Sequence, residues 1–141
     1  TDTARVVGSQ SVVVVLDVRK GRFGLGSRLF THNGKTRAKF DPTDFAEMAQ
    51  SAGAGEIVVN NISREGTMEG YDLGLLAAIR ERTTVPITAL GGAGSLDDIR
   101  ALFQRFGIIG AAAGSLFVFK GPFRAVLINY PDEEEKESLF P

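Results

Sequence analysis

Two glycine-bearing segments in the second half of the chain have the composition of phosphate-binding loops. In the first, the apolar run 85–90 leads into Gly91 and Gly92, and Ser95 and Asp98 follow. The spacing of Ser95 and Asp98 is that of a capping box, which marks the start of a helix. Glycines between a buried strand and a helix N-terminus leave backbone N–H groups open to a ligand, and the helix end adds partial positive charge. This pattern predicts a phosphate site.

The second segment repeats the arrangement: an apolar strand over 108–113 leads to Gly114 and Ser115. In a (β/α)8 barrel, the loops after the last two strands frequently bind a phosphate group. The alternative is that these glycines only form tight turns between strands and helices. Because the two segments lie in consecutive strand–helix units, we favour phosphate. We also expect that a β-branched residue at position 92 weakens phosphate binding without unfolding the chain.

Composition narrows the class of protein. The 141 residues are 43% hydrophobic and 23% charged, as in an ordinary globular domain. A net charge of −1 provides no broad basic surface for nucleic acid. The chain has no cysteine and one histidine, His32, so it offers no thiolate or two-histidine metal site. No apolar run approaches the length of a membrane span. We therefore expect a cytoplasmic protein with no metal, cofactor, nucleic-acid partner or membrane contact.

The first half of the chain predicts two strand–helix units. The continuously apolar segment 11–16 is typical of a parallel strand buried on both faces, and it ends at Asp17. Asn33-Gly34, at the centre of the polar segment 19–39, indicates a β-hairpin, beside which His32 is solvated. Asp41 and Pro42 then open a helix. The expected inner face of this helix comprises Phe45, Met48 and Ala49. The second strand is expected over 56–60. Asp72 then caps the second helix, whose apolar positions are Leu75, Leu76 and Ile79.

The second half of the chain predicts two further units. Helix 95–106 presents Ile99, Leu102 and Phe103 to the core and stops at Gly107. The fourth strand covers 109–113, and a short helix is expected over 123–127. The acidic run at 132–135 is most simply a solvated end.

Alternation of strands and helices predicts a parallel sheet with right-handed crossovers. Two architectures compete: an open doubly wound sheet and a piece of a (β/α)8 barrel. A whole barrel takes about 250 residues, so four units correspond to half of one. Glycine loops after the last two units favour the barrel. We therefore expect an α/β fold in which residues 1–131 form a (βα)4 half of a (β/α)8 TIM barrel and residues 132–141 form an acidic C-terminal tail.

Several motifs, in order, resemble the C-terminal half of the cyclase subunit of imidazole glycerol phosphate synthase. They cover nearly the whole chain: residues 9–14 with Asp17, 53–57, 64–72, 90–94 and 112–115. The ending, over 117–122 and 125–131, is similar to a subgroup of such cyclases encoded with surface-polysaccharide amidation genes.

The resemblance implies a reaction and a site. In that family the aspartate at the end of the fifth barrel strand, here Asp17, is a catalytic acid/base. The enzyme closes a ring on a phosphorylated ribosyl aminoimidazole-carboxamide, with ammonia from a glutaminase partner. The products are imidazole glycerol phosphate and a carboxamide ribotide. The glycine pairs of the last two units, here Gly91, Gly92, Gly114 and Ser115, bind one of the substrate's phosphates.

The loop after the second strand departs from the family pattern. Where the family usually reads Asp-Arg-Asp-Gly-Thr, residues 63–67 are Ser-Arg-Glu-Gly-Thr. Glu65 and Thr67 are therefore candidates either for substrate contact or for anchoring the loop, with Gly66 between them. Asn60 precedes this loop and is a candidate to bond substrate or neighbouring backbone. Asp17 itself has an alternative role, capping a loop or pairing with Arg19 or Lys20.

Two classes of function remain open. The first is a cyclase or lyase of histidine-biosynthesis type that works as an assembled barrel, with polysaccharide amidation as a variant of its substrate. The second is a non-catalytic half-barrel that binds phosphate only, as a fragment, a split-gene product or an engineered scaffold. A glutaminase partner is the less favoured expectation: Glu56 matches one member of the charged ring where ammonia enters, but the basic members belong to the other half of the barrel.

The expected fold also predicts self-association. Four parallel strands alone leave two unpaired edges and an apolar inner face that a closed barrel fills. We expect Val12, Val14 and Leu16 or their alternates, with Val58, Ile87, Ala89 and Ala111, to meet water unless a second copy covers them. A homodimer, or a higher even oligomer, would close eight strands and bring two Asp17 side chains to one mouth.

Overall fold

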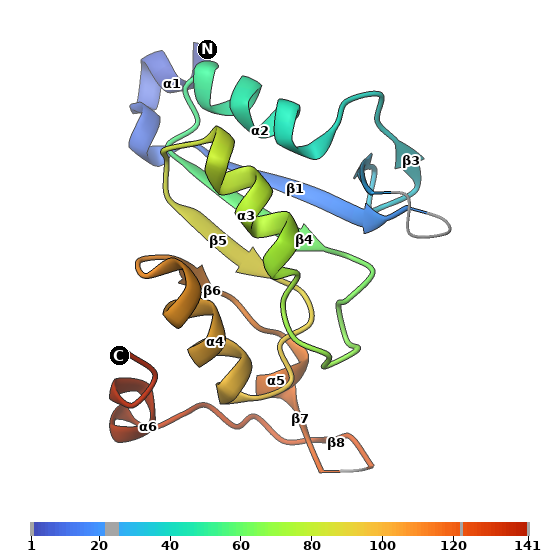
Figure 1. Cartoon of the computed structure of the whole chain (residues 1–141), viewed down its shortest axis with the longest axis vertical. Coiled ribbons are helices and arrows are strands. Elements are labelled where there is room, and N and C mark those ends of the chain that lie inside the picture. Colours follow the sequence, from blue (N-terminus) through green and yellow to red (C-terminus); the bar gives the residue numbers. More distant parts are fainter. Residues whose placement is uncertain (1, 22–25, 122, 141) are drawn as a thin grey trace.

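A six-stranded sheet in the order β3-β2-β1-β4-β5-β6 forms the centre of the computed structural model (Figure 1), which describes residues 2–21, 26–121 and 123–140. Its parallel strands are β1 (Val13–Lys20), β4 (Glu56–Asn61), β5 (Ile87–Leu90) and β6 (Gly110–Ala111). Strands β2 (Ser27–Thr31) and β3 (Thr36–Arg37) continue the sheet antiparallel beyond β1.

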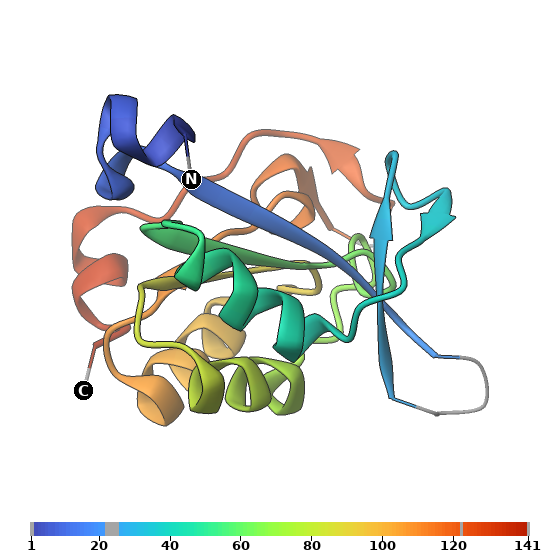
Figure 2. The ribbon, with the colours of Figure 1, turned by 90° about the horizontal axis from the view of Figure 1, so that it is seen from above.

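The three long helices all lie on one face of this sheet, as Figure 2 shows. They are α2 (Pro42–Ser51), α3 (Leu73–Arg82) and α4 (Leu96–Phe106). A doubly wound sheet would carry helices on both faces, whereas a barrel carries them only on its outside. The expected (βα)4 half-barrel is confirmed. The remaining elements are α1 (Asp2–Val7), a 3-10 turn (Ser9–Ser11), α5 (Ser115–Val118), β7 (Phe119–Lys120), β8 (Ala125–Val126) and α6 (Glu133–Glu137).

Burial alternates along the strands because one face is covered and the other is not. Leu16 and Val18 are buried under the helices, while Val13 and Val15 are 49% and 56% exposed on the helix-free face. The prediction that the first strand is buried on both faces is therefore wrong for this chain by itself. Ile87 and Ala89 also correct an expectation, since both are buried under the helices rather than facing water.

The first strand does not end at Asp17, as expected, but continues to Lys20. The extension exists because β2 pairs with it, from Asp17 opposite Phe30 to Lys20 opposite Ser27. The hairpin predicted around Asn33-Gly34 is confirmed as β2–β3, and His32 is exposed beside its turn.

The predicted helix starts are confirmed. The Asp41 carboxylate accepts a bond from the backbone N–H of Thr43, Asp72 caps α3, and Ser95 with Asp98 forms a complete capping box on α4. On α2 the predicted inner face is confirmed for Phe45 and Ala49, which pack against or within the core, but is wrong for Met48, which is 49% exposed. Buried positions 42, 46 and 49 set the face that packs inward, and Met48 lies beside it.

The C-terminal segment differs most from expectation. Residues 123–127 do not form the predicted helix; β7 and β8 form an antiparallel hairpin. Gly121 and Arg124, both at positive φ, make the turn that a helix cannot accommodate.

The acidic segment at 132–137 is exposed, as expected, but it forms α6 rather than a free tail. Leu139, 5% exposed, belongs to the core cluster, and the ring of Phe140 stacks on that of Phe103 with centroids 4.9 Å apart. Throughout the described ranges, no helix has both the length and the apolar character needed to cross a membrane.

Leu139→Ala tests this docking. Because Leu139 is buried in the core cluster, its truncation should lower the free energy of unfolding by about 2–5 kcal/mol. Urea denaturation measures the change, with Ile108→Ala, at a side chain 96% exposed, as the control expected to stay within about 0.5 kcal/mol. Equal stability of the two variants would show that the C-terminal segment does not pack on α4.

Candidate functional site

Strand register places Asp17 and Asn60 side by side on the helix-free face. Asp17 pairs with Asn60, and Asn60 with Leu90, so the three residues lie at one level of the sheet. The Asn60 amide nitrogen donates to Asp17 Oδ1 at 2.8 Å. Of the alternatives for Asn60, the structure thus shows a bond to a neighbouring side chain, which holds the carboxylate in a fixed orientation.

Asp17 does not pair with either of the cations beside it in sequence. Arg19 donates to the carbonyl oxygen of Gly34 at 3.1 Å and its guanidinium lies 4.5 Å from the centre of the Phe30 ring. The salt bridges of the described residues include none to Asp17. The carboxylate is thus held by an amide rather than by a cation.

The loop between β4 and α3 is closed by its own hydrogen bonds. Arg64 Nη1 donates to the carbonyl oxygens of Glu69 and Gly70 at 3.1 and 2.9 Å, and the Thr67 hydroxyl donates to the Arg64 carbonyl at 2.9 Å. Ser63 Oγ accepts a bond from the Lys20 backbone N–H at 3.1 Å. Thr67 and Ser63 therefore anchor the loop, while Glu65 is exposed at its outer side.

Gly91 and Gly92 allow the β5–α4 loop to pack tightly on the β4–α3 loop. Both glycines are buried and have positive φ. A β-carbon would lie 2.5 Å from the Asn61 carbonyl oxygen at Gly91 and 2.2 Å from that of Gly70 at Gly92. The Gly70 N–H also donates to the Gly92 carbonyl at 2.8 Å. A β-branched residue at position 92 would thus disrupt the loops, contrary to our expectation that it leaves folding intact.

The N-terminus of α4 is partly satisfied by its own cap. Asp98 Oδ2 accepts bonds from the backbone N–H groups of Gly94 and Ser95 at 2.9 and 3.0 Å. These two donors are occupied by a carboxylate of the chain itself.

Gly114 and Ser115, by contrast, face the outer side of the β4–α3 loop. A β-carbon on Gly114 would lie 3.2 Å from Glu65 Oε1. One on Gly66 would lie 3.7 Å from Ser115 Oγ and 3.8 Å from Arg124 Nη2. The structure therefore brings Glu65, Gly66 and Ser115 together, as the sequence predicted, and adds Arg124, which sequence reasoning missed because the hairpin that carries it was expected to be a helix.

Sequence reasoning also missed the buried polar side chains that fasten the β4–α3 loop. The Tyr71 hydroxyl donates to the Ala112 carbonyl oxygen at 2.9 Å. Asn61 bonds to Asp72 Oδ2 at 3.0 Å through its amide nitrogen and accepts from the Ser63 N–H at 3.1 Å. Burial, then the charges of Asp98 and Glu65, raise the pKa of Tyr71 above its usual value.

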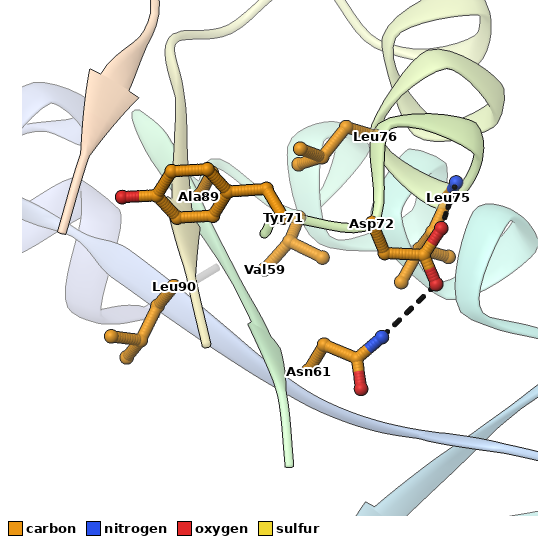
Figure 3. A pocket seen from close by; sticks show the side chains of 8 residues that line it. All are labelled: Val59, Asn61, Tyr71, Asp72, Leu75, Leu76, Ala89 and Leu90. Carbon is orange, nitrogen blue, oxygen red and sulfur yellow. Dashed lines mark hydrogen bonds between the residues drawn. The ribbon is translucent and has the colours of Figure 1, made fainter. Parts of the chain in front are cut away.

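The cavity beside these residues is too small for a substrate. It lies on the helix side of the sheet and has a volume of about 10 Å³, room for about one water. Figure 3 shows Asn61 turned toward Asp72 there. Its lining comprises Val59, Asn61, Tyr71, Asp72, Leu75, Leu76, Ala89 and Leu90. Among the described residues, moreover, no group of three or more His, Asp or Glu side chains could hold a metal ion.

Comparison with known proteins gives one consistent result. Residues 1–124 match the family described as histidine biosynthesis protein. Over 137 residues the chain is 51% identical to a candidate HisF subunit of imidazole glycerol phosphate synthase from Leptospira interrogans, covering 97% of this chain and 54% of that protein. The HisF subunit of that synthase from Metallosphaera sedula is 40% identical over 114 residues, 81% of this chain and 45% of the relative. The chain spans about half the length of these relatives.

Tyr71 gives a pH prediction for the loop anchor. Because the folded state raises its pKa, its contribution to stability is complete below about pH 10, where the unfolded tyrosine is still protonated, and is lost as pH rises further. The free energy of unfolding should fall by up to about 1.4 kcal/mol per pH unit above pH 10.

Tyr71→Phe should remove this slope and cost about 1–3 kcal/mol at pH 7, since the Ala112 carbonyl loses its partner. Tyr130→Phe, at an exposed tyrosine, is the matched control and should keep the slope. Urea unfolding between pH 8 and 11 measures the free energy of unfolding of both variants. If this free energy depends on pH with the same slope in both, the pH dependence does not come from Tyr71.

Proposed function

Because the chain belongs to the histidine biosynthesis protein family, we propose that it supplies one side of a cyclase site of the imidazole glycerol phosphate synthase type. The observation that carries this proposal is the Asp17–Asn60 pair, held at 2.8 Å on the helix-free face of the sheet. The loops that follow β4 and β6 meet at the same end of the sheet, at Gly66 and Ser115. An oriented carboxylate and an anion-binding edge are the two parts that such a site needs.

In this proposal Asp17 exchanges protons with the substrate. Ammonia condenses with a phosphorylated ribosyl aminoimidazole-carboxamide: its nitrogen enters the new ring, and water and the carboxamide ribotide leave. The Asp17 carboxylate takes up and returns the proton that moves as these bonds form and break. Asn60 keeps the carboxylate at a constant position, so less orientation is lost at the moment of reaction. Asn60 is thus a positioning residue for Asp17.

The phosphate of the substrate would lie at Gly114 and Ser115, beside Glu65 and Gly66. Gly114 and Ser115 are only half-buried, so their backbone and hydroxyl are open to a ligand. Gly91 and Gly92 support this site by keeping the neighbouring loop close, through the contacts with Asn61 and Gly70. A direct contact of Gly91 or Gly92 with phosphate stays a prediction. So does a role for Thr67 beyond its hydrogen bond to the Arg64 carbonyl. The cytoplasmic location of the protein is likewise a prediction.

We further propose that a second copy of the chain covers the helix-free face. Residues 13–16 of β1 pair with β4 on one side only, and β6 ends the sheet at the other side. Val13 and Val15 of β1 are exposed on the helix-free face. Pairing of these edges between two copies would bury the valines and close eight strands, as in a complete barrel.

A glutaminase partner is the weaker part of the proposal. Glu56, which matches a member of the ammonia-entry ring, accepts a bond from the Thr88 hydroxyl at 2.6 Å. Among the described residues it forms no salt bridge. We therefore expect free ammonia to serve better than glutamine.

Phosphate binding without turnover is the second candidate function, and Ser63 favours it. This residue stands where the family usually has an acid, and its hydroxyl is used to bond the Lys20 backbone. One catalytic carboxylate on this side, Asp17, is then left to do all the proton transfer.

Asp17→Asn separates these functions. Asparagine keeps the shape and the bond from Asn60 but cannot exchange the proton, so ammonia-dependent ring closure should fall at least about 100-fold. Phosphate affinity should not change. Asp97→Asn, at a carboxylate 84% exposed, is the control and should keep full activity. Activity of the Asp17 variant equal to the parent removes Asp17 from the mechanism, whereas a parent that binds phosphate but never turns over supports the second function.

Val15→Asp tests closure by a second copy. Sedimentation velocity at micromolar concentration should show a dimer, or a multiple of it, for the parent and a monomer for the variant, because a charge cannot be buried unpaired in the closed face. Met48→Asp, at a side chain 49% exposed on the helix side, should assemble like the parent. A folded monomeric parent would overturn this part of the proposal.

A further inference from the structure

We propose that Arg124, carried by the β7–β8 hairpin, is the cationic side chain that binds the substrate's phosphate at the Gly66–Ser115 edge. This inference rests on the proposed function, which places the phosphate there, and it names the residue that selects a doubly charged anion.

The hairpin is fastened to α5, so the position of Arg124 follows from the fold. Backbone N–H groups of Leu127 and Asn129 donate to the carbonyl oxygens of Val118 and Phe117 at 3.0 and 2.9 Å. α5 begins at Ser115, and the hairpin follows directly after this short helix (Figure 1). Arg124 lies at its turn and reaches the β4–α3 loop.

The backbone of Arg124 is in an unfavourable conformation for an arginine. Its φ is +50°, in the left-handed region where glycine or asparagine is preferred over other residues. An arginine at such a turn contributes nothing to forming it. Backbone strain of this kind gathers where a side chain has a function to perform.

The guanidinium is oriented but has no anionic partner. It lies over the Phe119 ring, with its central carbon 4.7 Å from the ring centre, a cation–π contact that favours this position. Arg82 and Arg100 form salt bridges with carboxylates, but within the described part of the chain Arg124 forms none, and its side chain donates no hydrogen bond there. Its donors are therefore available to a ligand.

Ser115 and Arg124 face one point. A β-carbon on Gly66 would lie 3.7 Å from the serine hydroxyl oxygen and 3.8 Å from Arg124 Nη2, so the absence of a side chain at Gly66 leaves space between the two groups. A hydroxyl and a planar guanidinium around one open position match the several oxygens of a phosphate group.

Glu65 makes a cation at this edge necessary. Its Oε1 reaches within 3.2 Å of a β-carbon placed on Gly114, and its charge is one cause of the raised pKa of Tyr71. A phosphate bound beside this carboxylate alone would be repelled. Arg124 offsets that charge, which explains how a longer acid at position 65 is compatible with an anionic ligand.

The test is a calorimetric titration of the folded chain with inorganic phosphate and, separately, with acetate. Arg124→Gln should weaken phosphate binding about tenfold or more, and Arg124→Lys should weaken it less. Arg105→Gln is the matched control, since Arg105 also lies over a ring, that of Phe106, at the opposite end of α4, and it should leave phosphate affinity unchanged. Acetate should bind more weakly than phosphate in every protein.

Two further variants keep the inference falsifiable. Arg124→Gly relieves the positive φ, so it should fold at least as stably as the parent and still lose phosphate affinity. Ser115→Ala tests the phosphate site itself. If Ser115→Ala weakens phosphate binding and the Arg124 variants do not, the inference is overturned while the proposed site stands. If neither has an effect, the proposed phosphate site fails. Equal affinity for acetate and phosphate would overturn the assignment to a doubly charged anion.

Discussion

Coverage of the sheet on one face only is the constraint from which the other features of this structure follow. Because α2, α3 and α4 all pack on one side, alternate residues of each strand enter a core made of Leu16, Val18, Ile57 and Ile87 among others. The intervening residues point to the opposite face, where valines and polar side chains share the surface. That division places Asp17 and Asn60 outside the core and within reach of a ligand.

The loops at the carboxyl ends of the strands are built by close backbone contact rather than by side-chain packing. Gly92 touches the backbone of Gly70, and Tyr71 crosses from the β4–α3 loop to the carbonyl of Ala112. Three strand ends are thereby tied into one rim. These contacts hold the loops of the rim close to one another.

The glycines show how one residue type serves two purposes at this rim. Gly91 and Gly92 are buried and exclude any side chain, which makes them structural in the first place. Gly114 is half-buried, and Gly66 leaves an opening between Ser115 and Arg124. Glycines that look alike in the sequence thus differ in their surroundings. Gly66 and Gly114 are better candidates for contact with phosphate than Gly91 and Gly92.

Local signals in the sequence determined the parallel strands of the half-barrel and the helix caps at Asp41, Asp72 and Ser95. Caps and strand patterns depend on a few neighbouring residues, so they can be read without knowing the fold. Tertiary structure decided the rest. Whether Met48 or Ala46 faces inward depends on how α2 is rotated against its neighbours, and the bond from Asn60 to Asp17 depends on the pairing of strands far apart in sequence. Arg124 reaches the rim only because the chain folds back after α5, and no pattern of adjacent residues encodes that return.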